Sequence, residues 1–190
     1  MRPGRFCVDK RGKKAYNQSI LSQRGVFSVN KQETCAYLRA HGVPFEATEH
    51  AAVYNMAEAG KLNLPHPEAD AKNLFVRDDK KRAYYLITVQ GDRRVDLKAF
   101  RQAHGTRPLS FASPEEMQEY LGLTPGSVTP LGALNDPQAR VKVYVDEGLL
   151  SGEGLIGVHP NDNTATVWLK TADLIRLLRG HGSEVETFKP

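Results

Sequence analysis

Apolar runs separated by polar turns mark out the strands of this chain, and the clearest of them opens with a lysine. Residues 74–76 (Leu-Phe-Val) are consecutive apolar residues, a pattern typical of a strand covered on both faces. A polar stretch at 78–82 and a second apolar run at 83–89 follow, which predicts a β-hairpin with a rather long loop. Lys72 has the parity of positions 74 and 76, so its side chain should leave the sheet on a face that soon becomes apolar. Burying an ammonium there is costly unless an anion meets it, and the alternative is a side chain that reaches water at the strand end.

The remaining elements follow from helical spacing, caps and further apolar runs. We expect helices at residues 32–41, 55–62, 96–104 and 113–121 and from Thr171 onward. We expect further strands at residues 45–50, 141–145, 155–158, 164–169 and 185–188. Asp96, Ser113 and Thr171 are the expected N-caps, and Asn55 with Glu58 has the pattern of a capping box.

The order of these elements indicates the fold class. Residues 123–132 hold two prolines and two glycines, so we expect them to be irregular. Strands and helices are mixed along the chain but do not alternate as βαβ units. The sequence therefore predicts an α+β fold, with a mixed, mostly antiparallel sheet flanked by helices.

Charge divides the chain into two parts. Its 190 residues, with 40% hydrophobic and 25% charged residues, have a globular composition and a net charge of +4. Residues 1–30 hold seven basic residues against one acidic residue, whereas residues 31–190 hold 19 basic and 21 acidic residues. We expect residues 1–30 to be a mobile basic extension and residues 31–190 to be the functional domain. Any RNA contact of that domain should therefore use a local patch and shape rather than a global field.

The extension itself carries no clear role. It could add affinity for phosphates, be a mitochondrial-type leader, or result from an upstream start. The chain has no apolar run of the roughly 18 residues that a membrane-spanning helix needs, and no secretory signal is visible. Cys7 and Cys35 lack metal-site spacing, so we expect reduced thiols and a cytoplasmic protein without membrane contact.

No familiar catalytic signature is present, and the histidines are too scattered to suggest a metal site. Four features remain: the Lys72-Asn73 strand start, the small-residue loop 126–130, His159 at a strand end, and Asn163 opening the next strand. Taken singly, each is more often structural than functional. Their order along the chain is the more specific signal.

In that order, residues 31–188 resemble the YbaK/prolyl-tRNA-synthetase editing-domain superfamily, and within it the freestanding alanyl-tRNA(Pro) deacylases of the ProXp-ala type. The matching stretches are Thr48-Glu49-His50, Asp70-Ala71-Lys72-Asn73-Leu74-Phe75, Gly126-Ser127-Val128-Thr129-Pro130, Val158-His159-Pro160 and Asn163-Thr164-Ala165-Thr166. Residues 1–30 fall outside the pattern.

This resemblance implies a trans-editing hydrolase that cleaves the ester between a mischarged amino acid and tRNA(Pro), releasing alanine. It implies Lys72 as the essential lysine, with Asn73 beside it in the site. It also implies a substrate pocket, whose residues would be Gly126, Ser127, Val128, Thr129, Pro130, Val158, His159 and Asn163. His159 would help to exclude larger amino acids such as proline. No cofactor or metal is implied, and the partners would be the acceptor end of mischarged tRNA(Pro) and prolyl-tRNA synthetase or an elongation factor.

The chemistry of the substrate agrees with such a site. An aminoacyl ester is already activated, so positioning and polarisation of its carbonyl matter more than a strong nucleophile. Lys72 could hold the terminal phosphate or the substrate oxygens, loop amides could stabilise the oxyanion, and a water molecule aided by the ribose 2′-hydroxyl would attack. A second sieve is needed because one methylene is worth only about 1–3 kcal/mol in a binding pocket.

Three alternatives stay open. The same fold could act on tRNA charged with cysteine, serine or threonine. The domain could instead bind tRNA or a synthetase without catalysis. It could also be a plain globular domain whose basic extension at residues 1–30 binds RNA.

Overall fold

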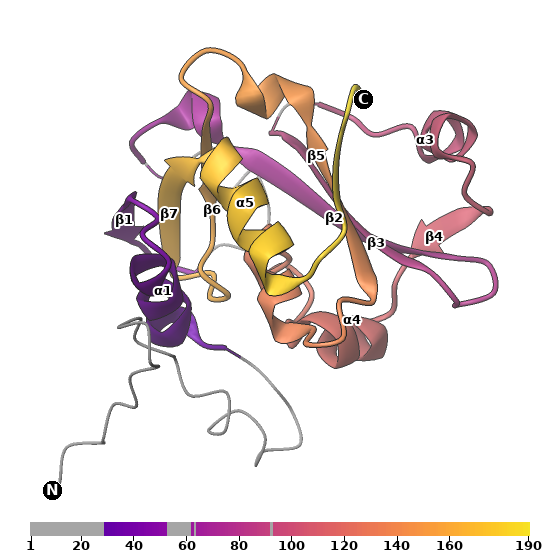
Figure 1. Cartoon of the computed structure of the whole chain (residues 1–190), viewed down its shortest axis with the longest axis horizontal. Coiled ribbons are helices and arrows are strands. Elements are labelled where there is room, and N and C mark those ends of the chain that lie inside the picture. The colour runs from indigo at the N-terminus through magenta and orange to yellow at the C-terminus, as the bar shows by residue number, and fades with distance from the viewer. Residues whose placement is uncertain (1–28, 53–61, 63, 92) are drawn as a thin grey trace, which may run out of the picture.

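The computed structural model describes residues 29–52, 62, 64–91 and 93–190 of the chain. Nearly all of the extension expected at 1–30, and of the helix expected at 55–62 with its Asn55–Glu58 box, lies outside these residues. Figure 1 shows the elements, which in chain order are α1 (Lys31–Ala40), β1 (Phe45–Glu49), the 3-10 helix η2 (Pro67–Ala69), β2 (Ala71–Asp78), β3 (Tyr84–Gln90), α3 (Leu97–His104), β4 (Leu109–Phe111), α4 (Pro114–Leu121), the 3-10 helix η3 (Pro130–Asn135), β5 (Val141–Asp146), the 3-10 helix η4 (Glu147–Leu150), β6 (Leu155–Val158), β7 (Ala165–Lys170), α5 (Thr171–His181) and β8 (Val185–Phe188). None of the helices within the described residues has the length and apolar content needed to cross a bilayer.

Side-chain caps fix where three of the helices begin. The Asp96 carboxylate accepts hydrogen bonds from two backbone N–H groups of the first turn of α3. Ser113 and Glu116 form a reciprocal capping box at α4, as expected from the sequence. Asn30 and Glu33 form a second such box at α1. The predicted caps at Asp96 and Ser113 are therefore confirmed.

Two expectations about the second half of the chain are wrong. Thr171 does not cap α5, because it is already the first helical residue, and Lys170 occupies the N-cap position without a side-chain bond. The fully buried Thr171 hydroxyl instead donates to the Leu149 carbonyl oxygen at 2.6 Å, satisfying a buried backbone acceptor. The irregular stretch 123–132 ends early, because Pro130 opens η3, where its missing N–H costs nothing.

The strands form two sheets rather than the single sheet expected. The smaller sheet has the order β1-β7-β6 and is antiparallel throughout. The larger sheet has the order β4-β2-β3-β5-β8, in which β3, β5 and β8 run parallel and the other pairs are antiparallel. Outside the named strands, a single parallel bridge within the described residues joins Asp70 to Gly157 and links β2 to β6. The α+β class with a mostly antiparallel arrangement is confirmed.

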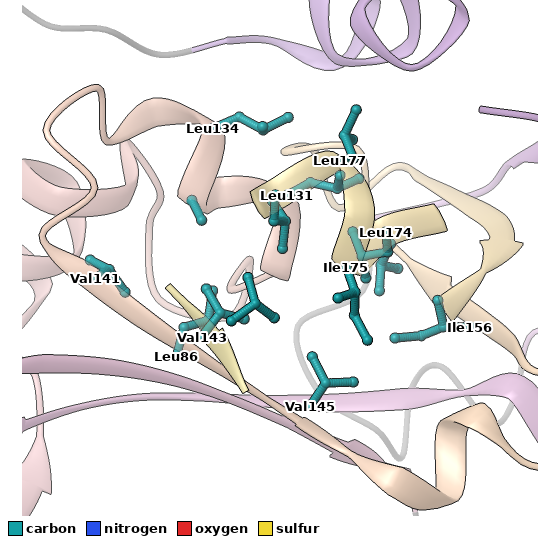
Figure 2. Packing of buried hydrophobic residues seen from close by; sticks show 14 of the residues in the cluster. Leu86, Leu131, Leu134, Val141, Val143, Val145, Ile156, Leu174, Ile175 and Leu177 are labelled. Atoms are coloured by element: carbon teal, nitrogen blue, oxygen red, sulfur yellow. The ribbon is translucent and has the colours of Figure 1, made fainter. Parts of the chain in front are cut away.

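Two apolar clusters cover the two faces of the larger sheet. The first cluster fills the space between this sheet, α5, η3 and the smaller sheet. Its members labelled in Figure 2 are Leu86, Leu131, Leu134, Val141, Val143, Val145, Ile156, Leu174, Ile175 and Leu177. The second cluster lies on the opposite face, where Phe100 of α3 packs with Val76, Ile87 and Tyr144. Phe75 belongs to the first cluster and Val76 to the second, so the prediction of a strand covered on both faces is confirmed.

Candidate active site

Lys72 lies near the start of β2, where the strand has just left its bridge to β6. Its pairing with Val89 of β3 is regular, so its side chain leaves the sheet on the face of Leu74 and Val76, as the sequence predicts. The residue is half-buried. Within the described part of the chain, no hydrogen bond or ion pair engages its ammonium group. The site therefore offers a cation that is partly withdrawn from water and uncommitted to any described residue.

Asn73 points to the opposite face of β2, because successive side chains of a strand alternate. It pairs with Thr88 of β3, and the Thr88 hydroxyl donates to the Asn73 side-chain oxygen at 2.8 Å. Thr88 is fully buried, so this bond fixes the amide orientation. The oxygen of Asn73 is thereby engaged, and its NH2 group is directed away from Thr88 as a hydrogen-bond donor.

The loop 126–130 is held mainly by its own hydroxyl groups. Ser127 Oγ donates to the Thr124 carbonyl oxygen at 2.7 Å and accepts from the Thr124 N–H at 3.1 Å. Gly126 has φ of 86°, which favours glycine at this turn. Thr129 is fully buried, and its hydroxyl donates to the main-chain oxygen of His159 at 2.8 Å. The hydroxyls of Ser127 and Thr129 thus build the loop, and the Ser127 N–H is bonded to the Thr124 carbonyl oxygen. The backbone N–H groups of Gly126, Val128 and Thr129 and the half-buried Val128 side chain remain as the groups available to a ligand.

His159 follows the last residue of β6, and one of its ring nitrogens has no partner. Its Nδ1 is buried and makes no hydrogen bond within the described residues. Burial, and then the proximity of His50, lower the pKa of His159 to about 4, although Asp162 acts in the opposite direction. The imidazole is therefore neutral at pH 7. A neutral ring whose buried Nδ1 has no described partner could form a hydrogen bond with a ligand.

His50 is a residue of this site that sequence reasoning missed. Its Nδ1 lies 2.8 Å from the Ala51 carbonyl oxygen, which can only accept, so Nδ1 carries the proton. Nε2 then accepts from the Thr166 hydroxyl at 3.0 Å. Thr166 is 8% exposed, so this hydroxyl supports the site rather than attacking a substrate. The position directly after β1, within the Thr48-Glu49-His50 match, was the available signal.

Hydrogen bonds within the turn between β6 and β7, and from this turn to the start of α1, hold the chain next to His50 and His159. Asp162 Oδ1 accepts from the Thr164 backbone N–H at 2.8 Å and from the Thr164 hydroxyl, and the hydroxyl bond is the largest cause that lowers the pKa of Asp162. Lys31 Nζ donates to Thr164 Oγ1 at 3.3 Å and to Glu49 at 3.0 Å. Asn161, with φ of 61°, donates from Nδ2 to the Val29 oxygen at 3.0 Å. The start of α1 thus holds the turn in place.

The other predicted site residues have supporting positions. Val158 is 1% exposed and belongs to the first cluster, and Pro130 is buried at the start of η3. Asn163 lies half-buried in the turn after His159. Cys35 is a free, half-buried thiol whose pKa is raised by burial, and Cys7 lies outside the described residues. Among the described residues, His, Cys, Asp and Glu do not gather into a group of three that could hold a metal ion.

The structure therefore brings some predicted residues together and leaves others apart. The loop 126–130 is bonded to His159 through Thr129, and Val128, Val158 and Asn73 all lie on the side of the first cluster. Lys72 leaves β2 on the other side. The arrangement offers backbone and amide donors, a neutral imidazole and a separate cation, which suits polarisation of a carbonyl next to an anionic group.

Comparison with known proteins agrees with this chemistry. Residues 50–177 match the model of the aminoacyl-tRNA editing domain. The chain is 40% identical over 159 residues to the prolyl-tRNA editing protein ProX of Acetoanaerobium sticklandii, covering 84% of this chain and 94% of that protein. It is 32% identical over 154 residues to prolyl-tRNA synthetase associated domain-containing protein 1 of Bos taurus, covering 77% and 87% of the two chains.

The solved structures agree as well. A crystal structure of a candidate trans-editing enzyme for prolyl tRNA synthetase superposes with a TM-score of 0.65 at 26% identity, covering 86% of this chain and 99% of that one. The resemblance stated from the sequence is thereby confirmed. The chain belongs to the aminoacyl-tRNA editing domain family, a family of aminoacyl-tRNA deacylases.

Proposed function

We propose that this protein is a cytoplasmic trans-editing hydrolase that removes alanine from mischarged Ala-tRNA(Pro). The observation that carries the proposal is Lys72, a half-buried lysine whose ammonium group is engaged by no described residue. Such a cation is costly unless it serves an anionic ligand, and the 3′ end of a tRNA supplies one. The similarity to a protein named for prolyl-tRNA editing supports tRNA(Pro) as the substrate.

The side chains of Lys72 and Asn73 leave β2 on opposite faces of the sheet, which suggests that they have separate roles in the reaction. Lys72 would hold the terminal phosphate or ribose oxygens of the tRNA from one side of β2. Asn73 and the backbone N–H groups of Gly126, Val128 and Thr129 would face the ester carbonyl from the other side and stabilise the negative charge that develops on its oxygen. A water molecule, positioned by the ribose 2′-hydroxyl, would add to the carbonyl carbon. The tetrahedral intermediate would then expel the ribose oxygen, which takes up a proton, to give free alanine and tRNA.

Selection of alanine would come from His159, which would limit the size of the side chain that the site accepts. The His159 ring is neutral and the Thr129 hydroxyl binds its main-chain oxygen, which supports a fixed position for the ring in the proposed pocket. A pocket that admits a methyl side chain and rejects the proline ring would spare correctly charged tRNA. The acceptor end of tRNA(Pro) is the partner in this reaction, and prolyl-tRNA synthetase is the expected source of the mischarged molecule.

The test is deacylation of Ala-, Cys-, Ser- and Pro-tRNA(Pro) by the purified full chain, its Lys72→Ala variant and the control Lys170→Ala. Lys170 is exposed and bonds only to a backbone oxygen among the described residues, so its loss should leave activity unchanged. We expect cleavage of Ala-tRNA(Pro) alone and a loss of about 100-fold or more in Lys72→Ala. Cleavage of cysteinyl or seryl esters instead would change the substrate, and full activity of Lys72→Ala would disprove the assignment of the lysine.

A further variant tests the selection of size. His159→Ala should enlarge the pocket, so hydrolysis of Pro-tRNA(Pro) should rise at least about tenfold relative to hydrolysis of Ala-tRNA(Pro). If the ratio of the two rates stayed at the wild-type value, His159 would not be part of the size filter.

A further inference from the structure

Positive charge is concentrated in one segment of the folded chain. Residues 77–111 hold nine basic and four acidic residues, although residues 31–190 as a whole hold 19 basic and 21 acidic residues. The rest of that part of the chain is therefore clearly acidic. Since the sequence predicts that any RNA contact of the domain is local, this segment is the place to look for it.

Apart from β3 and the loop after it, which lead to the start of β2, the segment folds into one end of the molecule. We call this the basic end: the turn between β2 and β3, the helix α3 with the loop that follows it, and the strand β4. Figure 1 shows the tip of the β2–β3 hairpin, β4 and α3 together on the right of the view, away from β6 and β7. The pairing of Asp78 with Leu109 joins β2 to β4. Arg107 also binds Asp79 through two hydrogen bonds of 2.6 and 3.0 Å, which tie the loop before β4 to the hairpin turn.

Three of the seven basic residues at or next to this end have a described acidic partner: Arg77 and Lys81 bind Glu116, and Arg107 binds Asp79. The other four have an exposed side chain and no ion pair within the described residues; they are Lys80, Arg82, Lys98 and Arg101. Asp96, the acidic residue nearest to α3 in sequence, is engaged in capping that helix.

An exposed aromatic ring lies beside these cations. Phe111 of β4 is 63% exposed and pairs with Val76, so its side chain shares the sheet face of Val76. The helix α3 covers the same face through Phe100, and Lys72 leaves β2 on this face too. Lys72 lies six positions before Asp78, the last residue of β2, a distance of about 20 Å. Lys72 and the basic end thus lie along one face of one strand.

We propose that the basic end binds the phosphate backbone of the acceptor arm of the tRNA whose 3′ end occupies the site at Lys72. The proposal rests on the proposed function and names the surface that the rest of the substrate contacts. Double-stranded RNA is recognised largely through its phosphates and shape, for which unpaired lysines and arginines are suited. Phe111 offers a ring on which an unpaired base near the 3′ end can stack. The acidic remainder repels the duplex and so favours this orientation.

The test compares two full-chain variants that lose the same formal charge. The first carries Lys80→Gln, Arg82→Gln, Lys98→Gln and Arg101→Gln at the basic end. The matched control carries Lys142→Gln, Lys170→Gln, Arg176→Gln and Lys189→Gln, which lie elsewhere on the described surface; Lys142 is half-buried and the other three are exposed. Binding of uncharged tRNA(Pro) is measured at several salt concentrations between about 50 and 200 mM.

We expect the basic-end variant to bind tRNA at least about tenfold more weakly at the lowest salt, and its log–log salt slope to be shallower by about 3. The control variant should stay close to the wild-type protein. Equal weakening in both variants would show a non-specific charge effect and overturn the proposal. An unchanged slope in the basic-end variant would also overturn the proposal. An acidic protein surface would then be the expected partner of the basic end.

A minimal substrate separates this proposal from the proposed function. Alanine esterified to adenosine has no acceptor helix, so the basic-end variant should cleave it at the wild-type rate. If the wild-type protein cleaves no aminoacyl ester, the proposed function fails, while the difference in tRNA binding between the two variants still decides the role of the basic end.

Discussion

Thr129 Oγ1 donates a hydrogen bond of 2.8 Å to the main-chain carbonyl oxygen of His159. The threonine is fully buried at the end of loop 126–130, and the histidine follows β6. This one bond ties the loop to the backbone that carries the His159 imidazole. Sequence reasoning placed both in the site but gave the threonine a role in binding substrate. The structure engages its hydroxyl elsewhere, which points to positioning.

Thr129→Val keeps the shape of the side chain and removes the donor. The buried His159 oxygen then loses its partner, at a cost of about 1–3 kcal/mol in the free energy of unfolding. We expect kcat/KM for Ala-tRNA(Pro) to fall about tenfold and the discrimination against Pro-tRNA(Pro) to decrease, because the position of His159 is no longer fixed. Thr129→Ser, which keeps the hydroxyl, should restore most of both. Wild-type discrimination in Thr129→Val would contradict the positioning role.

The stability of the protein should depend on His159 below pH 7. Its pKa of about 4 lies under the ordinary value of 6.5, so the unfolded chain binds a proton more readily than the folded protein does. The contribution of the neutral His159 ring to the free energy of unfolding is fully present above pH 6.5 and decreases as the pH falls to about 4. Between these values we expect a loss of roughly 2 kcal/mol from this residue.

Urea unfolding of the wild-type protein and of His159→Gln at pH 7 and pH 4.5 measures this loss. The variant cannot bind the proton, so its stability should change less between the two pH values. His50 and Asp162 face the same ring and remain in both proteins, which makes the comparison specific to His159. Parallel pH dependences of the two proteins would refute the prediction.

Glu116 is the acidic centre of a buried network at the start of α4. Its carboxylate accepts from Arg77 Nε at 2.9 Å, from the Ser113 N–H at 2.8 Å and from the Tyr84 hydroxyl at 3.2 Å, and Lys81 lies 3.3 Å away. Burial raises its pKa, but these bonds together outweigh burial and lower it to about 2. The stability that it contributes is present above pH 4.5 and is lost as the pH falls towards 2.

Replacing Glu116 by glutamine should lower the free energy of unfolding by about 3 kcal/mol, because Arg77 would stay partly buried without its partner. The exposed Glu119→Gln should change it by less than about 0.5 kcal/mol. Chemical unfolding at pH 7 measures both. Deacylation per folded molecule should be unaffected in either variant, since Glu116 lies outside the site, and a selective loss of activity would contradict this separation.

Gly157 provides the space for the only tryptophan of the chain. A Cβ atom at this position would lie 2.8 Å from Trp168 Nε1 and 3.1 Å from its Cδ1, so the indole ring must move. Trp168 is 1% exposed. Gly157→Ala should therefore destabilise the protein by about 1–3 kcal/mol and change the fluorescence of Trp168.

Gly180 is the matched control for this change. A Cβ atom at Gly180 of α5 meets nothing within 4 Å. Gly180→Ala should therefore be neutral or stabilise by up to about 1 kcal/mol, because alanine favours the helix. An unchanged fluorescence spectrum and stability in Gly157→Ala would mean that the indole has room that the structure does not show.

Local signals in the sequence were sufficient for much of the fold. The Ser113 cap, the Asp96 cap and the 72–89 hairpin each depend on residues close in sequence, and all three are present. The strand β4 was missed because Leu109–Phe111 is only three residues long and exists through its pairing with β2. Thr171 was misassigned because its partner, the Leu149 oxygen, is remote from the helix start in sequence.

The site shows the same limit. Lys72, loop 126–130 and His159 are visible as unusual residues at strand ends, and their grouping depended on resemblance. The proximity of His50 to His159 depends on β1 pairing with β7 and on β6 pairing with β7, and no spacing in the sequence encodes it. The preorganisation of Asn73 by Thr88 likewise becomes apparent only when the register of β2 and β3 is known.

The pairing of β1 with β7 also governs when the site can form during synthesis. Phe45 pairs with Leu169, so the first strand must wait while about 120 further residues are added, a delay of about 6 to 24 s at ordinary elongation rates. During that time its hydrogen-bonding edge is open to other nascent chains. Contacts of such high sequence separation also slow folding. The smaller sheet, and with it the turn that carries His159, can therefore form only after β7 has been synthesised, so we expect the site to be completed late in synthesis.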